Sequence, residues 1–220
     1  MITDQKVILM SCGPITVRVQ RDAAKYHGAI ALSDGDGTHE RPLHFVLLAC
    51  HADMADDAPI EATERATKAL AEAVLTRLQN DQSDVGDILE SSNAAAADTG
   101  RYYSVAAGRF TQSHVRIAAL GKVEATLVAT NTQEVIVTPN VIRIGENAIL
   151  NASFGIGFKK EAVRVKDLSI EDDQMLLVTI GAGGATIAAS SRRHDAESFI
   201  DDLMSAVRVA PPIVAVMRLT

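Results

Sequence analysis

The order of the hydrophobic periodicities is the feature that most constrains this chain. Apolar runs of strand length come first, two segments with helical spacing follow, and a long series of period-two segments begins after Gly100. One more helical segment and a closing strand complete the sequence. Strands that do not alternate one by one with helices argue against a doubly wound parallel sheet. The order predicts an α+β fold instead: a four-layer α-β-β-α sandwich of two antiparallel sheets flanked by helices, with residues 1–220 forming a single domain.

The expected elements follow from the same patterns. Apolar residues at helical spacing predict helices at 60–78, 85–97 and 195–207. The segment 147–158 is predicted to be a loop, because it contains Gly155 and Gly157. Strands are predicted at 6–10, 15–19, 28–32, 43–49, 102–107, 114–120, 125–130, 134–138, 141–144, 161–166, 174–180 and 213–219.

Charge and composition exclude several classes of protein. The chain is 47% hydrophobic, which argues against intrinsic disorder, and its net charge of −7 argues against binding to nucleic acid or to an anionic membrane. No stretch approaches the roughly 20 apolar residues that a membrane helix needs. The first residues lack the basic start and apolar run of a signal peptide. Cys12 and Cys50 are too few for a disulfide framework, so a cytoplasmic location is predicted.

Several segments carry a resemblance to one family. Residues 45–54 resemble a strand followed by an Ala-Asp-Gly-Met-Gly-Gly loop, and 61–63 resemble part of a Gly-Glu-x-Ala-Ser helix. Residues 115–124 resemble a strand that ends in Gly-Asp-Ser-Arg, 176–182 resemble Leu-Leu-Leu-x-Ser-Asp-Gly, and 211–216 resemble Asp-Asn-Ile-Thr-Val-Val. These motifs, in this order, are those of the type 2C metal-dependent protein phosphatases, the PPM family. The resemblance covers nearly the whole chain and implies the four-layer sandwich.

The resemblance fails at the residues that carry the chemistry. The family holds Mg²⁺ or Mn²⁺ on carboxylates that activate a bridging water. Its aspartates correspond here to Cys50, Gly181 and Pro211, its carbonyl-ligand glycine to His51, and the glutamate of its Asn-Glu-Asp to Arg21. Gly, Pro and Arg offer no carboxylate, and Cys is a soft ligand that does not suit Mg²⁺. The resemblance therefore implies a pseudophosphatase without metal or catalytic residues. Such a protein would act by binding a protein partner, such as a phosphoprotein or a kinase.

An alternative interpretation retains the activity. If the acidic ligands are displaced from the family positions, the chain is a Mn²⁺- or Mg²⁺-dependent serine/threonine phosphatase, with an arginine holding the phosphate group. The candidate residues for this alternative are Arg18, Asp22, Asp34, Asp53 and Asp57.

Two clusters near the first strands contain residue types that bind metals or act in catalysis, but we interpret both clusters as structural. Asp34 and Asp36 lack the remaining ligands and the flanking helices of an EF-hand, so an acidic hairpin tip is expected. Cys50 and His51 are neighbours at the end of a strand and would face opposite sides, so they are not expected to work as nucleophile and base. A soft-metal site at Cys50 would need another Cys or His nearby. His44 or Cys12 could supply it, but nothing in the spacing indicates that either does.

Two further features are weak indications of a site. The glycine-rich segment 181–186 lacks the Lys-Ser/Thr of a P-loop and is expected to be a flexible loop, and 190–194 is a small basic patch before the last helix. An N-terminal-nucleophile hydrolase also uses a four-layer sandwich. That class would require cleavage before Ser11 or Cys12, which would remove the strand predicted at 6–10.

Overall fold

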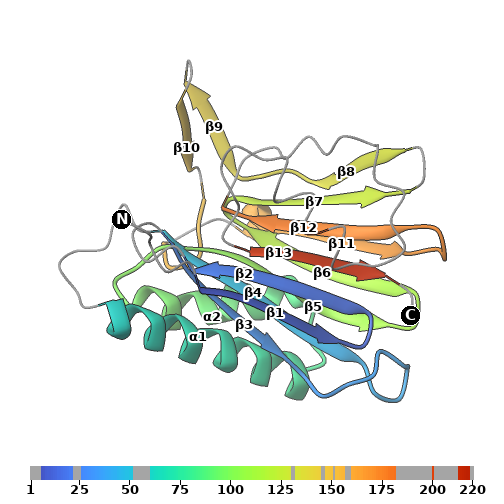
Figure 1. Ribbon diagram of the computed structural model, residues 1–220. Coiled ribbons are helices and arrows are strands. Elements are labelled where there is room, and N and C mark those ends of the chain that lie inside the picture. Colours follow the sequence, from blue (N-terminus) through green and yellow to red (C-terminus); the bar gives the residue numbers. More distant parts are fainter. Residues whose placement is uncertain are drawn as a thin grey trace.

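The fold consists mainly of antiparallel β-sheet (Figure 1). The computed structural model describes residues 6–21, 26–51, 60–129, 132–144, 147–150, 152–156, 160–181, 200 and 213–218. These ranges contain a six-stranded sheet, a five-stranded sheet and a separate two-stranded sheet. Within the same ranges, no helix has the length and apolar character needed to cross a membrane.

The six-stranded sheet brings together the two ends of the chain. The first hairpin pairs with the last strand, and Val19 lies opposite Ile213 in this pairing. The last strand pairs on its other side with the strand that ends at Ile180. Every pairing in this sheet is antiparallel. Its strands, in spatial order, are β1 (Lys6–Cys12), β2 (Ile15–Arg21), β13 (Ile213–Arg218), β12 (Met175–Ile180), β7 (Val123–Val128) and β8 (Gln133–Val137).

The five-stranded sheet is a meander with one added edge strand. Its spatial order is β11 (Arg164–Ser169), β6 (His114–Leu120), β5 (Tyr103–Thr111), β4 (Leu43–His51) and β3 (Tyr26–Leu32). All nine residues of β4 are buried, as expected for an inner strand of a sheet covered on both faces. The two-stranded sheet consists of β9 (Val141–Ile144) and β10 (Asn147–Leu150), which extend away from the sandwich in Figure 1.

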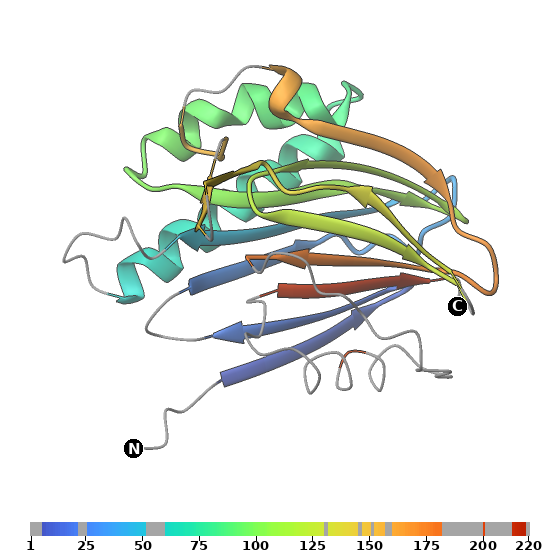
Figure 2. The same cartoon turned by 90° about the horizontal axis from the view of Figure 1, so that it is seen from above.

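Alternation along β4 separates two hydrophobic cores. Phe45 and Leu47 belong to the core between the two large sheets, together with Leu176 and Val178 of the facing sheet. Val46 and Leu48 point the other way and pack against helices. Because successive side chains of a strand point to opposite faces, one strand contributes to both cores. The two sheets therefore stack face to face, and Figure 2 shows the helices on the outer side of the β3–β6 layer.

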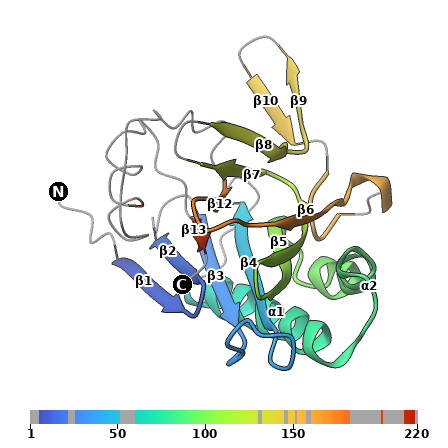
Figure 3. The same cartoon turned by 90° about the vertical axis from the view of Figure 1, so that its right-hand side faces the viewer.

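Two helices cover the outer face of the five-stranded sheet (Figure 3). Helix α1 (Ile60–Asn80) buries Leu70, Val74 and Leu78, whose spacing places them on one side of the helix. Helix α2 (Val85–Ala97) begins at Asp84, whose carboxylate accepts a hydrogen bond from the Gly86 N–H at 2.8 Å. This N-cap satisfies one of the amide groups that a helix start leaves unpaired.

The predicted α+β sandwich of two antiparallel sheets is confirmed, with two local corrections. The segment 147–158 is not entirely a loop, because 147–150 form β10. The strand predicted at 161–166 is displaced: Lys160–Ala162 form a 3₁₀ turn, and the strand is β11 at Arg164–Ser169. The predicted last helix at 195–207 lies outside the described residues except for Ile200, which is helical and fully buried.

Candidate functional site

The strand ends of both large sheets meet at one end of the sandwich. In the six-stranded sheet, Arg21 ends β2 and Gly181 follows β12, and the pairing of Ile213 with both Val19 and Ile180 puts these two ends side by side. In the five-stranded sheet, Cys50 and His51 end β4. The fold therefore collects the described positions that the family resemblance assigned to the missing metal ligands, and Pro211 lies outside the described residues.

A chain of hydrogen bonds joins the two sheets at this end. His51 Nε2 lies 2.7 Å from Ser104 Oγ, and the same oxygen accepts a hydrogen bond of 2.7 Å from the Lys122 N–H. The Gly181 N–H then donates to the Lys122 carbonyl at 2.9 Å. Ser104 is fully buried and His51 is nearly so. We call Cys50, His51, Ser104, Lys122 and Gly181 the strand-end cluster.

Gly121 allows this chain of hydrogen bonds to form. Its φ is +92°, and a Cβ added there would lie 2.5 Å from Ser104 Oγ, so any other residue would clash as well as strain the backbone. Asn140 holds the same turn through its buried side chain. Its side-chain oxygen accepts a hydrogen bond from the Gly121 N–H at 3.0 Å, and its side-chain amide donates to the Ala162 carbonyl at 3.0 Å. The turn before β7 is therefore held on both sides.

Cys50 belongs to the helix-side core rather than to an open site. Its exposed fraction is 1%, and it packs in the cluster that includes Leu48, Tyr103 and residues of α1. Burial raises the pKa of the Cys50 thiol, and the nearby Arg101 guanidinium only partly opposes this effect. The thiol is therefore neutral at physiological pH, which is the wrong state for a nucleophile or a metal ligand.

The candidate residues of the alternative, active enzyme are only partly described. Asp34 lies in the loop between β3 and β4, at the opposite end of β3 from Tyr26, which pairs with His51. Seven residues of strand span roughly 20 Å, so Asp34 is not brought together with the strand-end cluster. Arg18 follows Val17 of the inter-sheet core and therefore faces the outer side of its sheet. Asp22, Asp53 and Asp57 lie outside the described residues.

The strand-end cluster does not suit a hard cation. Mg²⁺ and Mn²⁺ bind carboxylate, carbonyl and water oxygens, whereas the cluster offers a neutral thiol, an imidazole that contacts Ser104, and a glycine. Within the described ranges, no group of three or more His, Cys, Asp or Glu side chains is placed to hold a metal ion. At the acidic hairpin tip, the Asp36 carboxylate accepts hydrogen bonds from the Thr38 N–H and hydroxyl at 3.0 and 2.8 Å. Asp36 therefore stabilises the loop itself, as expected for a structural rather than a metal-binding carboxylate. The segments 182–190 and 191–194 lie outside the described residues.

Ser104 and Asn140 are the site residues that the sequence did not reveal, whereas Lys122 lies in the segment 115–124 that resembles the Gly-Asp-Ser-Arg strand. Ser104 left one signal, because it is a hydroxyl residue within the otherwise apolar run Tyr103–Ala107. A polar residue in a buried strand requires a partner, and the partner can be named only when the fold is known.

Solved structures of bacterial serine/threonine phosphatases and of RsbX share this fold. A serine/threonine phosphatase from Staphylococcus aureus superposes with a TM-score of 0.63 at 11% sequence identity, covering 100% of this chain and 96% of that one. A serine/threonine phosphatase from S. agalactiae gives 0.63 at 11% identity, with 98% and 100% covered. RsbX in complex with magnesium gives 0.57 at 12% identity, with 96% and 97% covered.

These likenesses define the class of fold and nothing finer. No protein-family model matches the sequence, and a comparison with curated protein sequences finds no match. At identities of 11–12% a structural likeness shows shared architecture, and function must be argued from the site. The chain has a phosphatase-like fold of the PPM type.

Proposed function

We propose that this protein is a catalytically inactive member of the phosphatase-like fold that acts by binding a protein partner. The observation that carries the proposal is the residue set at the strand ends. Where the family has carboxylates, this chain has Cys50, Gly181 and Pro211, and it has Arg21 at the glutamate position. A dinuclear Mg²⁺ or Mn²⁺ site needs several carboxylate oxygens close together.

The geometry of the strand-end cluster supports this proposal. His51 and Ser104 are buried and contact each other, and the Ser104 oxygen also accepts from the Lys122 N–H. Groups that hold two sheets together in this way are used structurally, because moving them to bind a substrate would leave buried polar atoms without partners. The cluster thus has the character of a fold support rather than of a reaction centre.

The proposed partner is a protein, with a phosphoprotein or a kinase as the candidates. One structural neighbour comes from work on the bacterial stressosome, described as a modular system adapted to control secondary messenger signalling, and it superposes with a TM-score of 0.58 at 13% identity. The net charge of −7 disfavours nucleic acid and anionic lipid as partners. A cytoplasmic location, expected from the cysteine content, belongs to the same proposal.

The first test measures catalysis directly. We expect no turnover of para-nitrophenyl phosphate or of a phosphoserine peptide with 1–5 mM Mn²⁺ or Mg²⁺, about the concentrations that saturate such sites. We also expect no binding heat on Mn²⁺ titration. An active bacterial serine/threonine phosphatase serves as the positive control. EDTA-sensitive turnover that Asp53→Asn abolishes and Asp34→Asn leaves intact would contradict the proposal, because Asp34 lies at the other end of the sandwich.

The second test addresses binding. A partner captured by crosslinking in cells is purified and titrated against the full chain. Lys122 is partly exposed at the strand ends, so Lys122→Glu is expected to weaken the complex by about tenfold. Lys166→Glu, an identical charge reversal on the exposed edge strand β11, is the matched control and is expected to have no effect. Equal effects of the two variants would argue against binding at the strand ends.

A further inference from the structure

The loop between β3 and β4 contains both Asp–Gly pairs of the sequence, Asp34–Gly35 and Asp36–Gly37. The chain has no Asn–Gly pair. An Asp–Gly pair is chemically reactive, because glycine lacks the Cβ that hinders attack of its own nitrogen on the preceding carboxyl group. The two pairs have the same local chemistry, so their contacts in the folded loop decide which of them can react.

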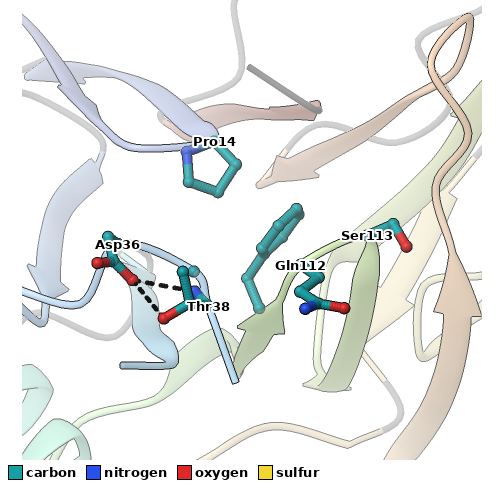
Figure 4. A pocket seen from close by; sticks show the side chains of 7 residues that line it. Pro14, Asp36, Thr38, Gln112 and Ser113 are labelled. Atoms are coloured by element: carbon teal, nitrogen blue, oxygen red, sulfur yellow. Dashed lines mark hydrogen bonds between the residues drawn. The ribbon is translucent and has the colours of Figure 1, made fainter. Parts of the chain in front are cut away.

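The Asp36 carboxylate is held in place by its neighbours. Oδ1 accepts hydrogen bonds from the Thr38 N–H at 3.0 Å and from the Thr38 hydroxyl at 2.8 Å, drawn as dashed lines in Figure 4. Arg41 lies 3.6 Å from Oδ2 and forms an ion pair with it. The hydrogen bonds from Thr38 lower the pKa of the Asp36 carboxyl, with a smaller contribution from Arg41. These contacts favour the ionised form, which is a poor electrophile.

The amide group of Gly37 is held as well. Its N–H donates to the Arg41 carbonyl at 3.0 Å, and its carbonyl accepts from the Gln112 N–H of the β5–β6 turn. Gly37 is buried, and a Cβ added there would lie 3.2 Å from the Phe110 ring. A reaction between Asp36 and Gly37 would therefore break hydrogen bonds at both reacting groups.

Asp34 is exposed and lacks such restraints. Its carbonyl oxygen accepts from Arg41 at 2.8 Å, but within the described part of the chain its carboxylate makes no hydrogen bond or ion pair. The Gly35 N–H lies 3.4 Å from Ser33 Oγ, which is longer than a normal hydrogen bond. That oxygen already accepts from the His44 N–H at 2.8 Å. Both reacting groups of Asp34–Gly35 are thus available.

We propose that Asp34 isomerises spontaneously to isoaspartate in the folded protein, whereas Asp36 is protected. The Gly35 nitrogen attacks Cγ of the protonated Asp34 carboxyl, a C–N bond forms, and the hydroxyl group leaves with the amide proton as water. Water then adds to either carbonyl carbon of the resulting succinimide ring and breaks the C–N bond at that carbon. Opening at the main-chain carbonyl gives isoaspartate, with a backbone longer by a methylene and with mass and charge unchanged.

Arg41 favours the isomerised product. It donates to the main-chain carbonyl oxygen of Asp34, and in isoaspartate this carbonyl becomes the free carboxylate. The product thus carries its charge at an atom that already has a cationic partner, which strengthens the hydrogen bond. The site lies at the loop end of the sandwich and does not depend on the function proposed for the strand ends.

The experiment incubates the full chain at physiological temperature and pH, folded and in urea. Electron-transfer fragmentation of the peptides locates isoaspartate, and methyl transfer from S-adenosylmethionine by a protein-isoaspartate methyltransferase measures its amount. In the folded protein we expect Asp34 to isomerise at least about tenfold faster than Asp36, because Asp36 must give up hydrogen bonds to react. In urea the two rates should be similar. Equal rates in the folded protein, or no isoaspartate at 34 when the unfolded chain forms it, would overturn the proposal.

Variants of the loop test the cause of the difference. Thr38→Val removes the hydroxyl that holds Asp36 and is expected to raise the rate at Asp36 about tenfold, whereas Thr38→Ser keeps the hydroxyl and is the matched control. An unchanged rate at Asp36 in Thr38→Val would contradict the protective role of this contact.

Asp34→Glu tests the assignment of the site. A glutamate would need a larger ring, so this variant is expected to lose nearly all isoaspartate in the folded protein. Gly35→Ala is less suitable, because its Cβ would lie 2.2 Å from the Pro42 carbonyl oxygen. Isoaspartate that persists in folded Asp34→Glu would show that another residue is modified, and it would contradict the proposal.

Discussion

At the scale of single residues, the Ser104 side chain is a buried hydrogen-bonding group that connects several elements of the fold. Its hydroxyl contacts His51 Nε2 and accepts from the Lys122 N–H, and it sits against Gly121, where no Cβ would fit. One oxygen atom therefore connects β4, β5 and the turn before β7. Removing a buried hydrogen-bonding group leaves its former partners unsatisfied, which costs more than the bond itself contributed.

Ser104→Ala is expected to lower the free energy of unfolding by about 1–3 kcal/mol, because His51 Nε2 and the Lys122 N–H both lose their contact with the Ser104 hydroxyl. Urea denaturation followed by circular dichroism measures the change. Ser83→Ala, at an exposed serine in the α1–α2 connection, is the control and should change stability by less than about 0.5 kcal/mol. A similar effect of the two substitutions would show that the hydrogen-bond chain does not stabilise the fold.

His44 makes stability depend on pH. Burial lowers the pKa of the His44 imidazole below its ordinary value of 6.5, and the nearby Arg109 lowers it further, while a hydrogen bond to the Pro42 backbone partly opposes both. The unfolded chain therefore takes up this proton at a higher pH than the folded chain does. Stability from the neutral ring is complete above pH 6.5 and is lost as the pH falls through the lowered pKa.

We expect the unfolding free energy of the parent protein to fall more steeply between pH 7.5 and 5 than that of His44→Gln. Chemical denaturation at a series of pH values gives both slopes. The exposed His39→Gln variant is the comparison and should follow the parent. Parallel curves for the parent and His44→Gln would mean that the buried imidazole has no part in the pH dependence.

At the scale of elements, an ion-pair network connects an edge strand to a helix. Arg116 of β6 pairs with Asp167 of β11 at 3.1 Å and with Asp84, the N-cap of α2. His114 Nε2 also lies 2.6 Å from Asp167 Oδ1. Edge strands have unpaired backbone groups on one side and open easily, so side-chain anchors of this kind limit their fraying.

Arg116→Ala is expected to lower stability by about 1 kcal/mol or less, because the network is partly exposed to solvent. The clearer effect should be local, with faster amide hydrogen exchange in β11 and at the start of α2. Lys166→Ala, which truncates an exposed basic side chain of β11, is the matched control. The difference between the two variants should shrink in 1 M salt, about the concentration that screens exposed pairs. Uniform acceleration across the whole chain would contradict the local role.

The sequence predicted most elements but not how distant residues meet. Strands such as β4 and β12 could be predicted from the sequence because apolar runs and alternating polarity are local properties of the chain. The four residues of β10 were missed because so short a hairpin gives little periodicity beside the glycines at 155 and 157. The contact of His51 with Ser104, 53 residues away in the chain, depends on the packing of two strands and could not be derived from either segment alone.

At the scale of the whole molecule, the core between the sheets couples the two halves of the chain. It contains Ile15 and Val17 from the first hairpin, Leu47 from the five-stranded sheet and Ala215 from the last strand. Since each sheet covers the apolar face of the other, neither is expected to remain folded alone. We propose on this basis that residues 1–220 fold as one domain.

Leu47→Ala, in the middle of that core, is expected to lower the free energy of unfolding by about 2–5 kcal/mol and to keep a single transition. The chain contains no tryptophan, so tyrosine fluorescence and far-UV circular dichroism are compared during denaturation. Tyr103 is fully buried and reports on the helix side of the sheet. Two transitions that do not coincide would contradict a single cooperative domain.

The position of the strand-end cluster has a consequence for the opposite end of the sandwich. The β4 strand, nine residues long, runs from the β3–β4 loop to the strand-end cluster, so the two ends of the sandwich are separated by roughly 30 Å. A macromolecule bound at the strand ends therefore leaves the hairpin loops at the other end uncovered.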